Sequence, residues 1–280
     1  NIVYADREDN IFYMSNARLS VRDNSINWRN LVIGDTSSLI LNKYHPYDDL
    51  PKLLNPPSGY IFNTNNSPFN STSKEYNLIE EDYNSTFSYR EKENNRSLRF
   101  MEIIKDYDKV NFDDFKKIKY DQKYPDSLAY VGNINKIFTL NVQDENLSDV
   151  HNLIKNWDKG GSYDNLGAAQ WSLFYRFILD ILSENNLKVT DEISITFFED
   201  ALSKSKKHLQ KYFNRIDIVL GDLQKHVRGD EVLPVSGLID MIAPTYVIEN
   251  DNGTFRSVSG ESYIMLVQYS DSGVEIETVL

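Results

Sequence analysis

The apolar side chains of this chain change their spacing twice, and that change limits the fold. Short runs rich in β-branched and aromatic residues lie at residues 2–6, 10–14 and 59–64. Between about residues 98 and 213, apolar residues recur three and four positions apart, which is typical of amphipathic helices. Strand-like runs return after residue 246. The order strands, helices, strands indicates an α+β architecture with a large helical insertion in a sheet.

We therefore divide residues 1–280 into three segments: strands and a long connection at 1–69, a mainly helical insertion at 70–215, and returning strands at 216–280. The strongest helix is expected at about 164–184 and another at about 194–213, with its lysines facing solvent. Asn111 and Ser148 are expected to cap two further helices. The side chains expected to face inward include Phe112, Phe115, Ile118 and Ile195.

Turn residues between the β-prone runs predict how the strands connect. Residues 2–6 and 10–14 form an expected hairpin, and Asn252-Gly253 is a strong hairpin turn between 246–248 and 254–258. The apolar run from Ser262 to Tyr269 predicts a buried strand, and the alternation at 274–279 predicts a half-exposed one.

Charge and composition argue against several classes of function. The net charge of −12 disfavours nucleic acid and anionic membrane surfaces, because both require a basic face. The chain has no cysteine, which removes thiol nucleophiles, disulfides and thiolate metal sites. No run of about 18 apolar residues is present that would span a membrane. The start at Asn1 and the strand-like end at Leu280 lead us to expect a segment of a longer polypeptide.

Few motifs in the chain carry chemistry by themselves. A phosphate loop, a dinucleotide fingerprint, a zinc HExxH motif and a nucleophile elbow are all missing from the sequence. We interpret the histidines as structural or surface residues, with His208 on the lysine-rich helix face. The acidic clusters at 80–82 and 113–114 have the oxygen ligands that calcium prefers, although such clusters are more often solvated surface.

The most informative stretch is residues 55–68, which read NPPSGYIFNTNNSP. Turn-forming proline and glycine residues flank a short expected strand, which ends in uncharged carboxamide side chains. Such a segment suits the presentation of fixed N–H donors to a developing negative charge. On composition alone, a polar loop in an Asn-rich protein is the favoured interpretation of the stretch.

Four segments resemble the penicillin acylase family of N-terminal nucleophile hydrolases. Residues 55–68 are similar to its motif NP-x-SGY-x-x-N-x-NN-x-P, and residues 4–13 (YADREDNIFY) resemble the hairpin that precedes it. Residues 95–99 (NRSLR) resemble the downstream R-x-x-R helix start. Residues 221–230 (GDLQKHVRGD), followed by LPV at 233–235, and residues 260–267 (GESYIMLV) resemble two later segments. The matches follow the family order through nearly the whole chain, and the acylases of acyl-homoserine lactones and lipopeptides look closest.

The resemblance implies a partial β chain of a periplasmic or secreted amidase with an αββα sandwich fold. It implies an N-terminal Ser nucleophile whose own α-amine acts as base, with Asn65 in the oxyanion hole and Arg96 supporting the site. Asn66 is a weaker alternative to Asn65. The implied partners are a small acyl-amide substrate, an α chain and the remainder of the β chain. Calcium is a metal that family analogy allows, but its ligands cannot be placed because residues 70–95 differ in length from the family.

Departures from the family pattern keep two hypotheses open. Asn1 is not a Ser, Thr or Cys, so we expect the nucleophile to lie outside this sequence, and Leu220 stands where relatives often have Trp. The first hypothesis is a segment of an acylase that cleaves an amide between a hydrophobic acyl group and a polar amine. The alternative is a non-catalytic binding or structural module that retains the fold.

Overall fold

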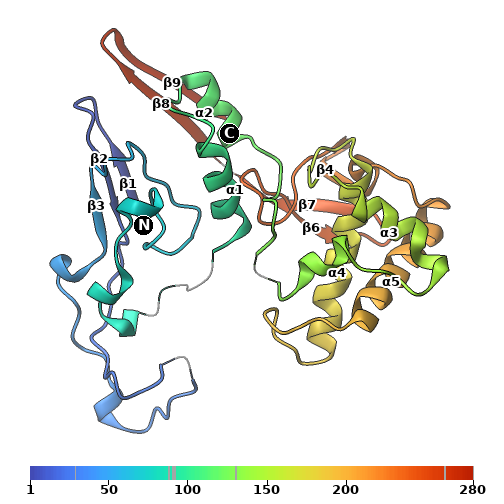
Figure 1. The fold of residues 1–280 in the computed structure, drawn as a ribbon, viewed down its shortest axis with the longest axis horizontal. Coiled ribbons are helices and arrows are strands. Elements are labelled where there is room, and N and C mark those ends of the chain that lie inside the picture. Colours follow the sequence, from blue (N-terminus) through green and yellow to red (C-terminus); the bar gives the residue numbers. More distant parts are fainter. Residues whose placement is uncertain (29, 88, 90–92, 130, 262, 280) are drawn as a thin grey trace. The chain divides into compact units, whose positions relative to one another are not determined.

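The computed structural model describes residues 1–28, 30–87, 89, 93–129, 131–261 and 263–279 (Figure 1). The chain divides into two compact units, the first formed by Asn1–Glu93 with Tyr269–Glu275 and the second by Asn94–Gln268 with Ile276–Leu280. Helices and strands occur together, so the predicted α+β class is confirmed. The αββα sandwich and the division at residues 69 and 215 stay predictions.

The first unit contains a three-stranded antiparallel sheet in the order β1-β2-β3. Strand β1 (Ile2–Ala5) pairs with β2 (Ile11–Met14), which pairs in turn with β3 (Lys52–Leu54). The predicted hairpin at the start of the chain is therefore confirmed. Its loop is held by Asp6, whose Oδ1 accepts the backbone N–H groups of Glu8 and Asn10 at 2.9 and 3.0 Å. The Asp6 carboxylate therefore stabilises the loop between β1 and β2, in addition to the backbone hydrogen bonds between these strands.

The strand predicted at residues 59–64 is wrong. This segment is irregular: it follows a turn in which Gly59 N–H donates to Pro56 O, and its link to the rest of the unit runs through Phe62 N–H to Ser71 O at 2.9 Å. Side chains take the other polar groups, because Thr72 Oγ1 donates to the carbonyl of Tyr60. Hydroxyl and carboxamide side chains that bond nearby backbone compete with a strand ladder, and here they replace it.

The second unit holds the α-helices and most of the apolar core. Asn111 caps its helix as predicted, with its side chain accepting the Asp114 N–H at 2.9 Å. Ser148, predicted as a cap, is instead the first residue inside its helix, and Leu147 occupies the cap position. The helices are α1 (Asn95–Ile104), α2 (Phe112–Lys119), α3 (Ser148–Lys155), α4 (Leu166–Glu184), α5 (Ile195–Phe213) and the short α6 (Leu220–Leu223).

Some side chains that the helical period predicts as inward are exposed. Ile118 is buried, whereas Phe115 is 41% exposed, and Ile195 at the start of α5 is 54% exposed. The helical spacing of apolar residues identifies which side chains share one face of a helix. It does not show how much of that face is covered by the rest of the protein. His208 differs in the opposite direction: it is buried, and its ring nitrogen Nε2 lies 2.8 Å from Gly253 O.

The core of the second unit centres on Trp171 of α4. Its indole stacks on Trp157 and Phe138 with ring centroids 5.3 and 5.7 Å apart, and Phe174 continues the cluster toward Phe198. A mixed four-stranded sheet in the order β5-β4-β7-β6 packs on the same helices through Phe255, which lies with Leu173 and Leu209 in a smaller buried cluster. Aromatic contacts therefore join helices and sheet into one body.

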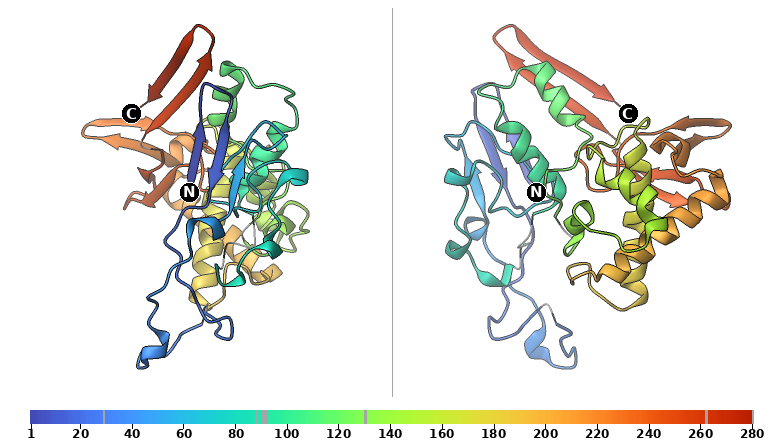
Figure 2. Two further views of the ribbon diagram at one scale, coloured as in Figure 1. Left: turned by 90° about the vertical axis from the view of Figure 1, so that its left-hand side faces the viewer. Right: turned by 45° about the vertical axis from the view of Figure 1, so that its right-hand side comes forward.

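The sheet of the second unit is built from β4 (Gln224–Arg228), β5 (Glu231–Pro234), β6 (Tyr246–Glu249) and β7 (Phe255–Ser259), which two further views show beside α4 and α5 (Figure 2). Strands β6 and β7 pair antiparallel around the Asn252-Gly253 turn, as predicted. Strands β4 and β7 pair in parallel, with Gln224 opposite Phe255. This parallel pair places residues distant in sequence next to each other on one face.

The last strands form a separate hairpin of β8 (Ile264–Ser270) and β9 (Gly273–Val279). The prediction of a buried strand at 262–269 is wrong: Leu266 alone among the described residues of β8 is buried, and Met265 is 51% exposed. Two strands without a further neighbour in the sheet leave faces open, which is why burial does not follow from the apolar run. Ser262 lies outside the described residues.

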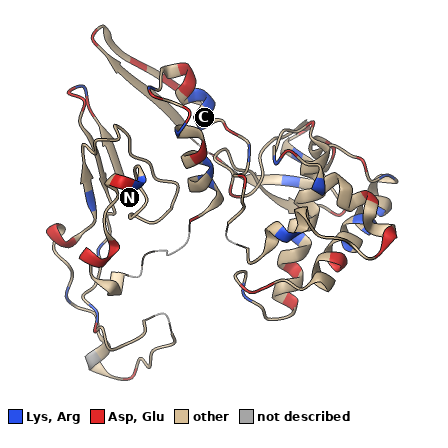
Figure 3. Cartoon of the chain, viewed as in Figure 1, with Lys and Arg blue, Asp and Glu red and all other residues tan. Residues whose placement is uncertain are grey.

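Acidic and basic side chains alternate along both units rather than gathering into one basic region (Figure 3). On α5, Lys204 and Lys206 pair with Asp200 and Asp149 at 3.2 and 2.7 Å, so the lysine-rich face is compensated by carboxylates. None of the helices in the described part of the chain has the length and apolar character needed to cross a membrane.

Candidate active site

Asn65 lies in the first unit at the tip of a tight turn. Its backbone is left-handed, with a φ of 64°, and its side chain is exposed. Few residues other than glycine adopt this conformation, and asparagine is among those that tolerate it best. The backbone N–H of Asn65 donates to Asn63 Oδ1 at 3.2 Å, which helps to fix the turn. The carboxamide is therefore carried outward by a defined local structure.

Asn66 differs from its neighbour in being buried. It is 6% exposed, and its Oδ1 accepts the backbone N–H of Thr64 at 2.7 Å and the Thr64 hydroxyl at 3.0 Å. Its Nδ2 donates to Ser67 O at 3.1 Å and to Asn70 O. Both amide hydrogens are thus already donated to backbone carbonyls. Asn66 shapes the turn, and the turn presents Asn65.

The turn is held from its other side by a second carboxamide. Asn77 Oδ1 accepts the backbone N–H groups of Ser71 and Thr72 at 2.9 and 3.1 Å. Side-chain oxygens that accept backbone N–H groups act as local caps, so the segment keeps its shape without a strand ladder. The sequence pattern predicted a strand in this stretch, where the structure has a turn held by carboxamide side chains.

Arg96 lies in the second unit, in the first turn of α1. The helix begins with a capping box in which the Asn94 side chain accepts Ser97 N–H at 2.8 Å and Ser97 Oγ accepts Asn94 N–H at 3.2 Å. Arg96 Nε donates to Asp240 Oδ1 at 3.0 Å, and Asp240 Oδ2 accepts the backbone N–H of Asn95 at 2.9 Å. One carboxylate therefore bridges the start of the helix.

Asp240 is itself held in a left-handed conformation, with a φ of 60°. Both side chains of the Arg96–Asp240 pair are about one fifth exposed, at 21% and 19%. A partly buried pair that also satisfies a helix N-terminal N–H is stronger than an exposed ion pair. Because Arg96 and Asp240 are 144 positions apart, local sequence patterns do not indicate Asp240 as the partner.

The second arginine of the R-x-x-R segment has an equivalent partner. Arg99 donates from Nε and Nη2 to the two oxygens of Asp121, each at 2.9 Å. The hydrogen bond to Asp121 raises the pKa of Arg99 above its ordinary value, although burial acts in the opposite direction. Both arginines of the motif thus anchor α1 to loops outside the helix, 144 positions away for Arg96 and 22 for Arg99.

The two predicted site residues belong to different units, Asn65 to the first and Arg96 to the second, and each is described within its own unit.

The histidines form no triad with a serine among the described residues. His151 Nε2 lies 2.8 Å from Ile137 O, and His45 Nδ1 lies 2.9 Å from Asp49 Oδ2. Within the described ranges, no three carboxylate, imidazole or thiolate groups gather in a way that would hold a metal ion.

A comparison with families of known proteins places the chain among enzymes that hydrolyse amide bonds. The model of the penicillin amidase family matches residues 1–280, the whole sequence, and the chain belongs to this family. The resemblance read from the separate segments of the sequence is thereby confirmed.

Proposed function

We propose that this chain is part of an acylase that hydrolyses the amide between a hydrophobic acyl group and a polar amine. A Ser outside residues 1–280 acts as the nucleophile, its α-amine as the base, and the side-chain amide of Asn65 as a donor of the oxyanion hole. Membership of the penicillin amidase family supports the reaction class. The contrast between Asn65 and Asn66 supports the choice of donor.

The contrast carries the assignment because an oxyanion donor must be accessible to a substrate, and of the two carboxamides Asn65 is exposed whereas Asn66 is buried in the turn. Asn66 donates both of its amide hydrogens within the turn, so using them would break the turn. Asn65 is exposed on the same turn, and its rare backbone conformation aims the carboxamide outward. A carboxamide suits the role since it donates without a proton that can dissociate.

The proposed reaction proceeds through an acyl-enzyme ester. The Ser oxygen forms a bond to the carbonyl carbon while its proton moves to the α-amine, and the C=O electron pair moves onto the oxygen. Asn65 stabilises this negative oxygen, with one such donor contributing about 2.7–4 kcal/mol in the transition state. The C–N bond breaks as the amine nitrogen takes the proton, and water later cleaves the acyl-enzyme ester to release the acid.

Arg96 is proposed as a positioning residue rather than a group that touches the substrate. Its bond to Asp240 and the Asn95–Asp240 bond fix the start of α1, and a delocalised guanidinium holds such a carboxylate in one orientation.

The remaining family expectations belong to the same proposal: a periplasmic or secreted location, an α chain and further β-chain residues as partners, and the acyl-homoserine lactone branch. For calcium, the described residues contain no cluster of three carboxylate or imidazole groups, and no step is assigned to it.

The proposal is tested with Asn65→Gly in the full-length protein. Glycine accepts the left-handed backbone and removes the carboxamide, so the turn is kept while the donor is lost. We expect the turnover number for an acyl-amide substrate to fall about 10²–10³-fold. Asn186→Gly is the matched control, because Asn186 is also exposed and left-handed, with a φ of 55°. Turnover of Asn65→Gly within about twofold of the parent would contradict the assignment.

Sequencing the reading frame upstream of Asn1 distinguishes the acylase hypothesis from the hypothesis of a non-catalytic module with the same fold. An upstream Ser that becomes the N-terminus of the processed chain, followed by hydrolysis of acyl amides, supports the enzyme. A start codon directly before Asn1 would exclude the proposed nucleophile.

A further inference from the structure

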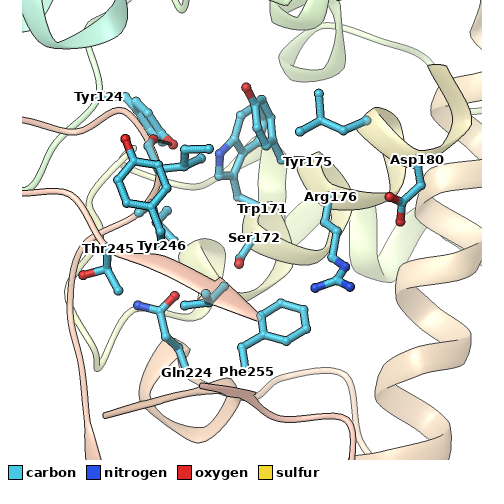
Figure 4. Close-up of a pocket in the computed structure, with 14 residues that line it drawn as sticks. Tyr124, Trp171, Ser172, Tyr175, Arg176, Asp180, Gln224, Thr245, Tyr246 and Phe255 are labelled. Carbon is cyan, nitrogen blue, oxygen red and sulfur yellow. Dashed lines mark hydrogen bonds between the residues drawn. The ribbon is translucent and has the colours of Figure 1, made fainter. Parts of the chain in front are cut away.

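The second unit contains a cavity of ≈ 260 Å³ between α4 and the β4–β7 sheet (Figure 4). Its walls combine aliphatic and polar side chains with aromatic ones, among them Tyr124, Trp171, Tyr175 and Phe255. An apolar cavity of about 150 Å³ is large enough to bind benzene. The cavity therefore has room for a six-membered aromatic ring with a short substituent.

Backbone pairing and helix spacing explain why these side chains meet. Gln224 and Phe255 are opposite each other in the parallel β4–β7 pair, so their side chains share one face of the sheet. On α4, Trp171 and Tyr175 lie one turn apart and face the same side, with Ser172 next to them. The sheet face and the helix face enclose the cavity between them.

Gln224 provides one directed polar group in this wall. Its side chain is 1% exposed, and its Nε2 donates to Val235 O at 3.1 Å and to Gly237 O at 2.9 Å. Two carbonyl acceptors fix which end of the amide is nitrogen, so the opposite end is Oε1. That oxygen points toward the cavity (Figure 4), and the hydrogen bonds of this side chain to the protein run through Nε2. A buried acceptor in this position favours a ligand that carries an N–H or O–H donor.

The charges at the rim favour a cation over an anion. Arg176 is the basic residue of the lining, but its guanidinium lies 3.2 Å from Glu249 and stacks 5.1 Å from the Phe255 ring. Its charge is therefore compensated within the protein. Asp180, one turn further along α4, is exposed at the rim. A wall that contains aromatic rings and an additional carboxylate attracts an ammonium group through cation–π and charge interactions.

We propose that this cavity binds a small aromatic amine. The ring lies between Trp171, Tyr175 and Phe255, the ammonium donates to Gln224 Oε1 and the Ser172 hydroxyl, and Asp180 adds attraction at the entrance. The site goes beyond the proposed acylase reaction and does not depend on it.

Isothermal titration calorimetry of the full-length protein tests the proposal with three probes of equal size. Benzylamine carries the cation, benzyl alcohol a neutral donor, and benzoate an anion. We expect benzylamine to bind about 3- to 30-fold more tightly than benzyl alcohol, as cation–π energies of about 0.5–2 kcal/mol imply. Benzoate should bind most weakly. Benzoate binding as tightly as benzylamine, or no binding of benzylamine, would overturn the proposal.

Two variants locate the binding. Ser172→Phe fills the cavity from α4 and should abolish benzylamine binding. Asp180→Asn changes an exposed residue without a folding risk and should weaken binding about two- to fivefold, whereas the control Asp164→Asn, exposed and outside the lining, should not. Unchanged affinity in both cavity variants would place the amine elsewhere. Asn65→Gly should leave the affinity unchanged, which separates this test from that of the oxyanion donor.

Discussion

The two units of this chain fix their backbones by different means. Residues 55–77 of the first unit are irregular, and buried or half-buried carboxamides such as Asn66 and Asn77 hold them in place. The second unit uses stacked aromatic side chains around Trp171 and regular helices. In the first unit the polar network surrounds Asn65, which is held in a left-handed conformation at the surface. An apolar core can instead enclose a cavity.

The largest effect is expected where the apolar core is removed. Trp171→Ala deletes a fully buried indole that contacts Trp157, Phe138 and Tyr124. The free energy of unfolding should fall by about 3–5 kcal/mol, because the transfer energy is lost and a void remains. Urea denaturation monitored by circular dichroism measures it. Tyr163→Ala, at a side chain 51% exposed, is the control and should change stability by less than about 0.5 kcal/mol. Equal effects of the two variants would contradict the core assignment.

A smaller and more local effect is expected in the polar network. Asn66→Ala removes two acceptor and two donor contacts, including those to the partly buried backbone groups of Thr64 and Asn70. We expect a cost of about 1–3 kcal/mol, confined to the turn. Limited proteolysis within residues 59–77 should become faster, while Asn16→Ala, exposed in the same unit, should leave it unchanged. Resistance to protease equal to that of the parent would show that Asn66 does not hold the turn.

The smallest effect concerns pH. Hydrogen bonds from Asn10, first from its backbone and then from its side chain, hold the pKa of Asp6 below its ordinary value of 3.8. Because the pKa is lower in the folded state, the stabilisation is present above the unfolded value and is lost as the pH falls through the folded pKa. Acid should therefore loosen the β1–β2 loop, as seen in the amide NMR signals of residues 6–10. Asp6→Asn should remove this pH response, and Asp9→Asn should retain it. A response that survives Asp6→Asn would refute the mechanism.

The sequence predicted the helices of the second unit well, because periodicity and caps are local signals. Asn111 was recognised as a cap from its position before Asp113 and Asp114, and the structure confirms it. Non-local contacts could not be predicted from the sequence: the Arg96–Asp240 pair joins residues 144 positions apart, and the parallel pairing of Gln224 with Phe255 joins strands β4 and β7, which are not consecutive in the chain. Such contacts follow from the assembled fold and leave no periodic trace in the chain.

The sequence pattern predicts which stretch holds the candidate site, but it does not predict the backbone conformation of that stretch. The pattern at 55–68 identified Asn65 and Asn66 together, and adjacent asparagines cannot be distinguished by type. Their difference appears only in the backbone, where Asn65 takes a φ of 64° and Asn66 turns inward to bond Thr64 and Asn70. The predicted strand failed for the same reason, since the side-chain amides took the backbone groups that a ladder would need.

The most direct test of the account compares the parent with Asn65→Gly in binding a boronic acid analogue of the acyl group to the full-length protein. Such a compound forms a tetrahedral adduct with a nucleophilic Ser, and its negative oxygen resembles that of the transition state. If Asn65 donates to the oxyanion, the variant should lose about 10²–10³-fold in boronate affinity, while the KM for an acyl-amide substrate changes little. Equal boronate affinity for both proteins would contradict the central claim.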